Sequence, residues 1–132
     1  MKGLVARLGE AIGYPERVPE GAVSFVFKVD DEPVEVRQRD GALLFRWMFP
    51  ENAPIVRLAE FAAGRFLRDR AVVAWDPFRD RALLWQRTPR GAGERALVEE
   101  FGRFLGACDW WKRCVAELVQ PKAPLAEIVI RP

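Results

Sequence analysis

The stretch AVSFVFKVDDEPVEVRQRDGALLFRWMF, residues 22–49, contains three apolar runs separated by two short polar turns. The first run has apolar side chains at alternate positions, namely Val23, Phe25, Phe27 and Val29. Such alternation is typical of a strand with one buried face, and short turns rich in Asp and Gly join antiparallel neighbours. The stretch therefore predicts a three-stranded antiparallel meander.

Apolar residues at helical spacing lie on both sides of this meander. Residues 2–12 have that spacing and are followed by Gly13 and Pro15, which end a helix. A second helix is predicted to start near Pro54 and to end at residues 68–70. The clearest seam consists of Leu97, Phe101, Phe104, Cys108, Trp111, Val115 and Leu118. Steps of three and four over this length predict a long amphipathic helix.

A second hairpin is predicted at residues 71–87, AVVAWDPFRDRALLWQR, where Trp75 and Trp85 lie in two apolar runs around a polar turn. Asp76 and Asp80 bracket that turn. An Asp at such a position commonly accepts hydrogen bonds from its own backbone. Because no other ligand-type residues cluster with these two, we expect a turn rather than an acid–base pair or a cation site.

The predicted order of elements is α–β–β–β–α–β–β–α. An antiparallel sheet with helices packed on it is the α+β layer arrangement. A chain of 132 residues is long enough for one core. We therefore predict a single α+β domain at residues 1–120 and a C-terminal tail at residues 121–132.

The composition removes most routes to catalysis. The chain contains no His, which excludes His-dependent nucleophilic pairs and His-ligated metals. Cys108 and Cys114 cannot complete a zinc site alone, and reduced thiols fit a reducing compartment. No apolar run is long enough to span a bilayer. We expect a cytoplasmic protein that is not an enzyme, binds no metal or cofactor and does not insert into a membrane.

Arginines are dense around the second hairpin, and Arg combined with Trp is typical of surfaces that bind single-stranded nucleic acid. These arginines are Arg65, Arg68, Arg70, Arg79, Arg81, Arg87 and Arg90. Carboxylates are interleaved with them and the formal net charge is only +2. Solvated charge around a core hairpin is the favoured interpretation, with no nucleic acid as partner. A small nucleic-acid-binding or regulatory module remains the alternative.

The predicted middle helix and second hairpin carry more apolar bulk than one sheet face of a small domain can cover. Each aromatic side chain removes about 150–250 Å² from water when it is buried, so leaving several exposed is costly. We therefore expect a second chain to cover this surface. The predicted dimer interface consists of Leu58, Phe61, Ala62, Phe66, Trp75, Phe78 and Trp85.

Three segments resemble the class I type III secretion chaperones, which are small bacterial cytoplasmic proteins with the same order of elements. LVARLGEAIG is similar to the opening helix of that family. IVRLAEFAAGRFLRDRAVVAWDPFRDRALLWQRTP resembles its middle helix, strand, D-P-containing turn and following strand. RALVEEFGRFLGACDWWKRCVAEL is similar to its last helix, so the resemblance covers about residues 3–119.

The resemblance implies a chaperone that dimerises and binds the N-terminal segment of a secreted effector or gatekeeper protein without using ATP. Such a client would add a strand to a sheet edge and press apolar side chains into patches. The candidate client-binding residues are Leu4, Leu8, Val34, Val36 and Trp110. The family is usually acidic, whereas this chain is mildly basic. A heterodimer with a more acidic mate therefore stays open beside a homodimer.

Overall fold

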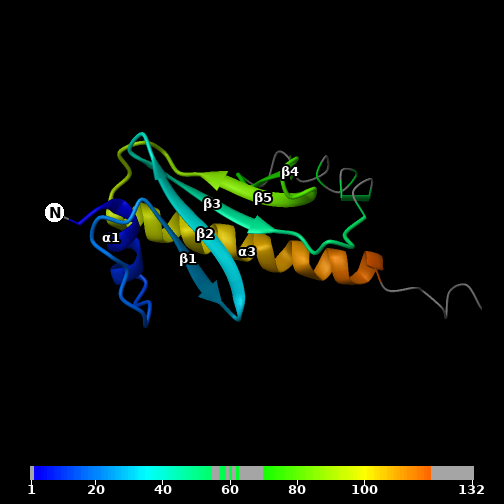
Figure 1. The fold of residues 1–132 in the computed structure, drawn as a ribbon, viewed down its shortest axis with the longest axis horizontal. Helices are drawn as coiled ribbons and strands as arrows, with labels where there is room; N and C mark the ends of the chain where they lie inside the picture. The colour runs from blue at the N-terminus through cyan, green and yellow to red at the C-terminus, as the bar shows by residue number, and fades with distance from the viewer. Residues whose placement is uncertain (1, 55–56, 59, 61, 63–69, 120–132) are drawn as a thin grey trace, which may run out of the picture.

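The computed structural model describes residues 2–54, 57–58, 60, 62 and 70–119. Five strands form one antiparallel sheet in the order β1-β2-β3-β5-β4 (Figure 1). The strands are β1 (Ser24–Val29), β2 (Glu32–Arg39), β3 (Ala42–Met48), β4 (Val72–Asp76) and β5 (Arg81–Arg87). The helices are α1 (Leu4–Ala11) and α3 (Glu94–Val119). The predicted α+β class is confirmed.

The predicted middle helix falls largely outside the described residues. Residues 57, 58, 60 and 62 are described, and all four are helical. The Leu58 amide donates to the Pro54 carbonyl at 3.0 Å, which is the hydrogen bond expected of a first helical turn. The predicted tail at residues 121–132 also lies outside the described part of the chain.

The predicted meander is confirmed, and both of its turns have two residues with positive φ. Asp30 and Asp31 have φ values of 50° and 65°, and Asp40 and Gly41 have 52° and 75°. Two-residue turns of this kind match the twist of the strands they join, and Asp and Gly tolerate the left-handed region better than other residues do. The first turn is tighter than predicted, so Glu32 already belongs to β2.

The second hairpin is also confirmed, with Trp75 opposite Ala82 and Asp76 opposite Arg81. The Asp76 Oδ1 atom accepts hydrogen bonds from the backbone N–H of Phe78 at 2.9 Å and of Arg79 at 3.3 Å. The Asp76 side chain therefore stabilises the turn by binding its backbone, as the sequence predicts.

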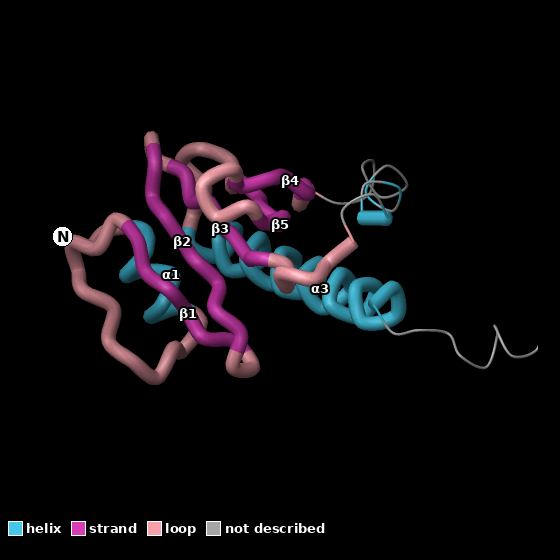
Figure 2. The backbone as a smooth tube through the Cα atoms, turned by 45° about the vertical axis from the view of Figure 1, so that its right-hand side comes forward, coloured by secondary structure: helices cyan, strands magenta, loops and turns pink. Residues whose placement is uncertain are grey.

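Both described helices pack on the same face of the sheet. In Figures 1 and 2, α3 crosses behind the strands while α1 lies beside β1 and β2. Phe101 of α3 places its ring 5.9 Å from that of Phe27 and 5.2 Å from that of Phe45. The predicted seam is confirmed through Val115, because its members from Leu97 to that residue are buried. The side chain of Leu118 is not described.

Buried polar contacts tie β5, and Thr88 directly after it, to the rest of the core. The Gln86 amide donates to the Glu100 carboxylate at 2.7 Å, and Arg70 forms an ion pair with the same carboxylate. The Thr88 hydroxyl oxygen accepts a hydrogen bond from the Leu43 amide at 2.9 Å. These contacts satisfy polar groups that would otherwise be buried without partners.

Candidate protein-binding site

Helices α1 and α3 cover one face of the sheet, and we call the opposite face the outer face. Directly paired residues of neighbouring strands share a face. The register pairs Arg46 with Trp85 and Trp85 with Val72 across three strands of this face. On the neighbouring rows, Leu44 pairs with Arg87, and Leu83 pairs with both Met48 and Ala74. Apolar side chains thus form the middle of the outer face.

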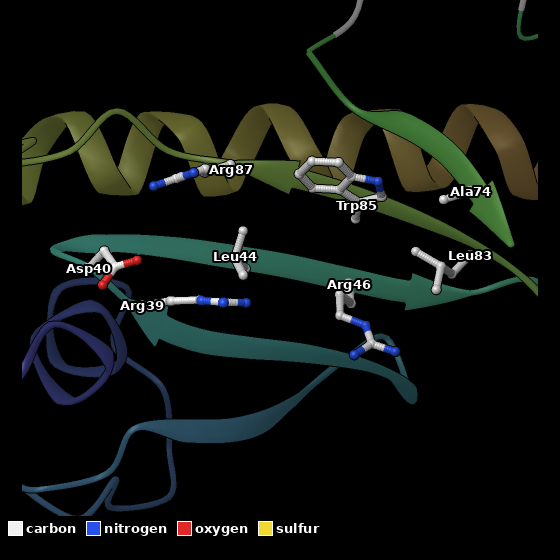
Figure 3. Close-up of a pocket in the computed structure, with 8 residues that line it drawn as sticks. All are labelled: Arg39, Asp40, Leu44, Arg46, Ala74, Leu83, Trp85 and Arg87. Atoms are coloured by element: carbon white, nitrogen blue, oxygen red, sulfur yellow. The ribbon is translucent and has the colours of Figure 1, made fainter. Parts of the chain in front are cut away.

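These side chains line a hollow of about 490 Å³, which we call the Trp85 hollow (Figure 3). Its lining residues are Arg39, Asp40, Leu44, Arg46, Ala74, Leu83, Trp85 and Arg87. Leu83 is buried, whereas Leu44, Ala74 and Trp85 are half-buried. The floor is therefore apolar and accessible to another molecule.

The rim of the hollow carries three guanidinium groups. Arg46 lies between two carboxylates, 3.7 Å from Glu35 and 3.4 Å from Asp76. Within the described residues, no carboxylate pairs with the guanidinium of Arg39 or of Arg87. The rim therefore carries charges of both signs, because the Asp40 carboxylate lines the hollow beside the three guanidinium groups.

The two tryptophans of the second hairpin lie on opposite faces of the sheet. Trp75 pairs with Ala82, which lies three positions from Trp85 on β5, and an odd separation along a strand places side chains on opposite faces. Trp75 is 41% exposed, and Phe78 in the turn is 98% exposed. One flat contact therefore cannot cover Trp75 and Trp85 together.

Strand β1 is one edge of the sheet, and its open hydrogen-bonding groups can be assigned. The Val23 carbonyl accepts from the Gln38 amide at 2.7 Å, and antiparallel pairs alternate along a ladder. The amides of Phe25 and Phe27 consequently point to β2, while those of residues 24, 26 and 28 point outward. The Lys28 amide donates to the Tyr14 hydroxyl at 2.9 Å, which agrees with this assignment.

The open part of the β1 edge is short and apolar. Tyr14 occupies the outward amide of Lys28, which leaves the outward groups of Ser24 and Val26 for another strand. Val23 is 66% exposed and Val26 is 49% exposed. An extended peptide could therefore pair here and also gain apolar contact.

Several candidate residues lie elsewhere than expected. The expectation that Val34 and Val36 lie on an edge strand is wrong, because β2 lies between β1 and β3. Both side chains are buried in the core, as is that of Leu8, while Leu4 is half-buried against it. The buried side chains are not accessible to a client in this structure, because they pack in the core between the helices and the sheet. Their role in client binding was inferred from the resemblance and stays a prediction.

The predicted dimer-interface residues differ in how far the described structure buries them. Leu58 is buried in the core of its own protomer, and Ala62 packs against that core. Phe61 and Phe66 lie outside the described residues. Trp110, which is predicted to bind the client rather than a second chaperone chain, is half-buried, with its ring edge-on to that of Trp111 at a centroid distance of 5.0 Å. Of the whole predicted interface, Trp75 and Phe78 are the two described side chains that are exposed.

The dense arginines of the second hairpin are partly engaged with protein groups. Arg70 pairs with Glu100, Arg79 lies 3.9 Å from Asp76, and Arg81 donates to the Phe49 carbonyl at 2.6 Å and 3.1 Å. Arg65 and Arg68 lie outside the described residues. The described arginines therefore do not form one uninterrupted free cationic surface.

Sequence reasoning missed the outer face and the β1 edge, although signals for both were present. Leu43–Leu44 and Leu83–Leu84 are adjacent apolar pairs within strands, so apolar side chains occur on both faces of β3 and β5. Val26 likewise interrupts the alternation of β1. Such doublets predict a sheet with a second apolar face.

Chemistry other than binding has little support in the described part of the chain. No group of three or more His, Cys, Asp or Glu side chains there could hold a metal ion. Burial raises the pKa of the Cys108 thiol to about 12, so this sulfur is not a nucleophile near neutral pH. Neither α1 nor α3 combines the length and apolar character of a membrane span.

No protein-family model and no curated protein sequence matches this chain. Solved structures with the same fold do match. A chain of the HopA1–SchA chaperone–effector complex superposes with a TM-score of 0.65 at 16% identity, covering 86% of this chain and 91% of that one. A chain of the ExoT–SpcS complex from Pseudomonas aeruginosa gives 0.62 at 17% identity, covering 83% and 97%.

A chain of the ExsC–ExsE complex gives a TM-score of 0.59 at 18% identity, with coverage of 91% of this chain and 92% of that one. The matches thus extend over nearly the full length of each neighbour. They show that this chain has the fold of class I type III secretion chaperones. The predicted resemblance is confirmed at the level of the fold.

Proposed function

We propose that this protein is a type III secretion chaperone, which dimerises and binds the N-terminal segment of a secreted effector or gatekeeper protein. It keeps that segment soluble and competent for export without using ATP. The observation that carries the proposal is that the described helices, α1 and α3, cover one face of the sheet and leave the opposite face accessible. In a fold shared with chains of chaperone–effector complexes, one face and one edge present apolar groups to solvent.

The client segment is proposed to pair along β1. The outward backbone groups of Ser24 and Val26 offer hydrogen bonds, and the exposed side chains of Val23 and Val26 offer apolar contact. Main-chain pairing binds extended segments with little dependence on their sequence. Ordering a flexible client costs free energy, so a large contact area beyond this edge is required.

Dimerisation is proposed to involve the exposed aromatic side chains of the second hairpin, Trp75 and Phe78. Aromatic anchors of this size dominate protein interfaces when they are buried. The second chain is either another copy or a related chaperone. Trp75→Ser together with Phe78→Ser is expected to shift the molar mass from dimer to monomer in light scattering while the circular dichroism spectrum is retained.

The central experiment is affinity capture of the tagged full-length protein from its native bacterium, under conditions that induce secretion and in nucleotide-free buffer. We expect one secreted protein to be enriched, and limited proteolysis of the complex should protect an N-terminal segment of it. A matched control uses the same bait with Val26→Pro. Failure to enrich any secreted protein, or protection of a folded internal domain instead, would contradict the proposal.

A further inference from the structure

The open part of the β1 edge is bounded at one end by a tyrosine. The Lys28 amide points outward and donates to the Tyr14 hydroxyl oxygen at 2.9 Å. The outward backbone groups of Ser24 and Val26 form no hydrogen bond within the described residues. We call these two residues the β1 window. A strand that pairs with the window can form two hydrogen-bonded pairs, and Tyr14 occupies the place of a third.

Tyr14 is fixed in this position by the fold. Its amide donates to the Gly9 carbonyl of α1 at 2.9 Å. Its ring is edge-on to those of Phe25 and Phe27, at centroid distances of 5.9 Å and 4.8 Å. Edge-to-face pairs of this kind stabilise a side chain beyond the effect of burial. The hydroxyl is therefore preorganised at the Lys28 amide rather than placed there by a flexible side chain.

The other end of the window is bounded by a turn. The Ala22 amide donates to the Pro19 carbonyl at 3.1 Å, and the Glu20 carbonyl of the same turn accepts from the Gly3 amide at 2.9 Å. Gly3 directly precedes α1, so the turn is attached to the start of that helix. A strand that extended past Ser24 in this direction would have to replace these hydrogen bonds.

We propose that Tyr14 ends the paired strand of the client at Lys28 and thereby fixes the register of the client on the β1 window. The paired strand would be about three residues long, because the window offers two hydrogen-bonded pairs with one residue between them. The exposed side chains of Val23 and Val26 lie on opposite faces of β1, since they are an odd number of positions apart. The client strand should therefore carry apolar side chains at successive positions. The inference rests on the proposed function for the source of this strand.

A second copy of this chain fits the window less well than an extended segment does. A two-fold antiparallel pair centred on Phe25 places Lys28 of each chain opposite Ala22 of the other. The Tyr14 side chain of one copy would then meet the Pro19 turn of the other. Both groups are held by the hydrogen bonds described above, so moving them aside costs those bonds. A flexible client segment brings no such obstacle.

The first measurement concerns the free protein and needs no ligand. Amide hydrogen exchange followed in ¹H–¹⁵N spectra should be rapid at Ser24 and Val26 and slower at Lys28. Tyr14→Phe keeps the ring but removes the acceptor. Exchange at Lys28 should then accelerate about twofold to twelvefold, as for the loss of one hydrogen bond. Unchanged exchange at Lys28 in this variant would overturn the role of the hydroxyl.

The second measurement uses the full-length protein and a probe peptide, acetyl-Ser-Thr-Thr-Val-Val-Thr-Ser-amide. One control replaces both Val by Ser, and the other carries an N-methyl group on every Thr and Val amide. We expect the probe to shift the amide signals of Ser24 and Val26 saturably, and both controls to bind several-fold more weakly. Equal binding of either control would overturn the proposal. So would a shift of the Lys28 signal as large as that of Val26.

Removing the tyrosine should lengthen the paired strand. In Tyr14→Ala the probe is expected to shift the Lys28 signal as well and to bind about fivefold more tightly or better, because a third pair adds two hydrogen bonds. Ile12→Ala also truncates a half-buried side chain beside α1 and should leave the affinity unchanged. If Tyr14→Ala does not fold, the Lys28 signal of the unchanged protein still decides. A concentration-dependent shift of the Ser24 and Val26 signals without peptide would indicate a second copy and overturn the proposal.

The outcomes separate this inference from the proposed function. If the probe binds the β1 window and stops before Lys28 but no secreted client is captured, the window is a peptide-binding edge and the chaperone proposal fails. If a client is captured and Tyr14→Ala changes neither its affinity nor the exchange of the Lys28 amide in the complex, the chaperone proposal stands and Tyr14 has been assigned wrongly.

Discussion

Val26→Pro separates client binding from folding, because the amide of this residue points away from the sheet. The Val23–Gln38 hydrogen bond sets the alternation along β1, and the bond from the Lys28 amide to Tyr14 agrees with it. Proline at position 26 therefore removes an outward donor and no ladder hydrogen bond. Edge strands tolerate proline where the missing amide faces solvent.

The expected magnitude follows from one backbone hydrogen bond. Such a bond contributes about 0.5–1.5 kcal/mol net, which corresponds to a loss of about twofold to twelvefold in client affinity. The ring also occupies the position through which a paired strand would approach, so this loss is a lower bound. The free energy of unfolding should fall by about 1 kcal/mol or less. Phe27→Pro, which removes a ladder amide and a fully buried ring, should cost more than about 3 kcal/mol.

Affinity is measured by fluorescence anisotropy with the captured client's N-terminal segment, and stability by urea unfolding. Val26→Thr is the matched control, because it changes the side chain but keeps the amide, and it should bind nearly as the unchanged protein does. A folded Val26→Pro variant with undiminished affinity would refute pairing along β1.

Three further predictions concern the core. Phe101→Ala should lower the free energy of unfolding by about 3–5 kcal/mol in urea, because the ring is buried between sheet and helix; a loss below 1 kcal/mol would contradict this packing. Thr88→Val should cost about 1–3 kcal/mol, since it leaves the buried Leu43 amide without an acceptor; an unchanged unfolding midpoint would show that another group replaces it. At pH 8 a thiol reagent should label Cys114 but not Cys108 until the protein is unfolded, because burial raises the pKa of Cys108 to about 12 and keeps it protonated; rapid labelling of both in the native state would disprove this.

Local patterns predicted the elements of this fold well. Alternation identified the meander, and the spacing from Leu97 to Val115 identified the buried seam of α3. Both signals arise from neighbours along the chain, which the sequence shows directly. The role of Asp76 in its turn was predictable for the same reason.

The arrangement of the elements was predicted less well, because it depends on contacts between distant residues. The position of β5 beside β3, with β4 outside it, is not contained in the periodicity of any strand. The placement of Val34 and Val36 on an edge was an avoidable error, since the middle strand of a meander has two neighbours. Leu8 illustrates a second reason for error. The apolar stripe of a helix shows which face is buried, but it does not show whether that face packs against the same chain or against a partner.

The opposed tryptophans make the β4–β5 hairpin a single layer of backbone with an aromatic side chain on each face of the sheet. If partner chains cover Trp75 from one side and Trp85 from the other, this hairpin becomes an interior layer of the assembly. Its amides should then exchange with deuterium far more slowly than in the isolated protomer. A bulky tag inserted at residues 77–80 should accordingly be tolerated by the lone chain and rejected by the complete assembly.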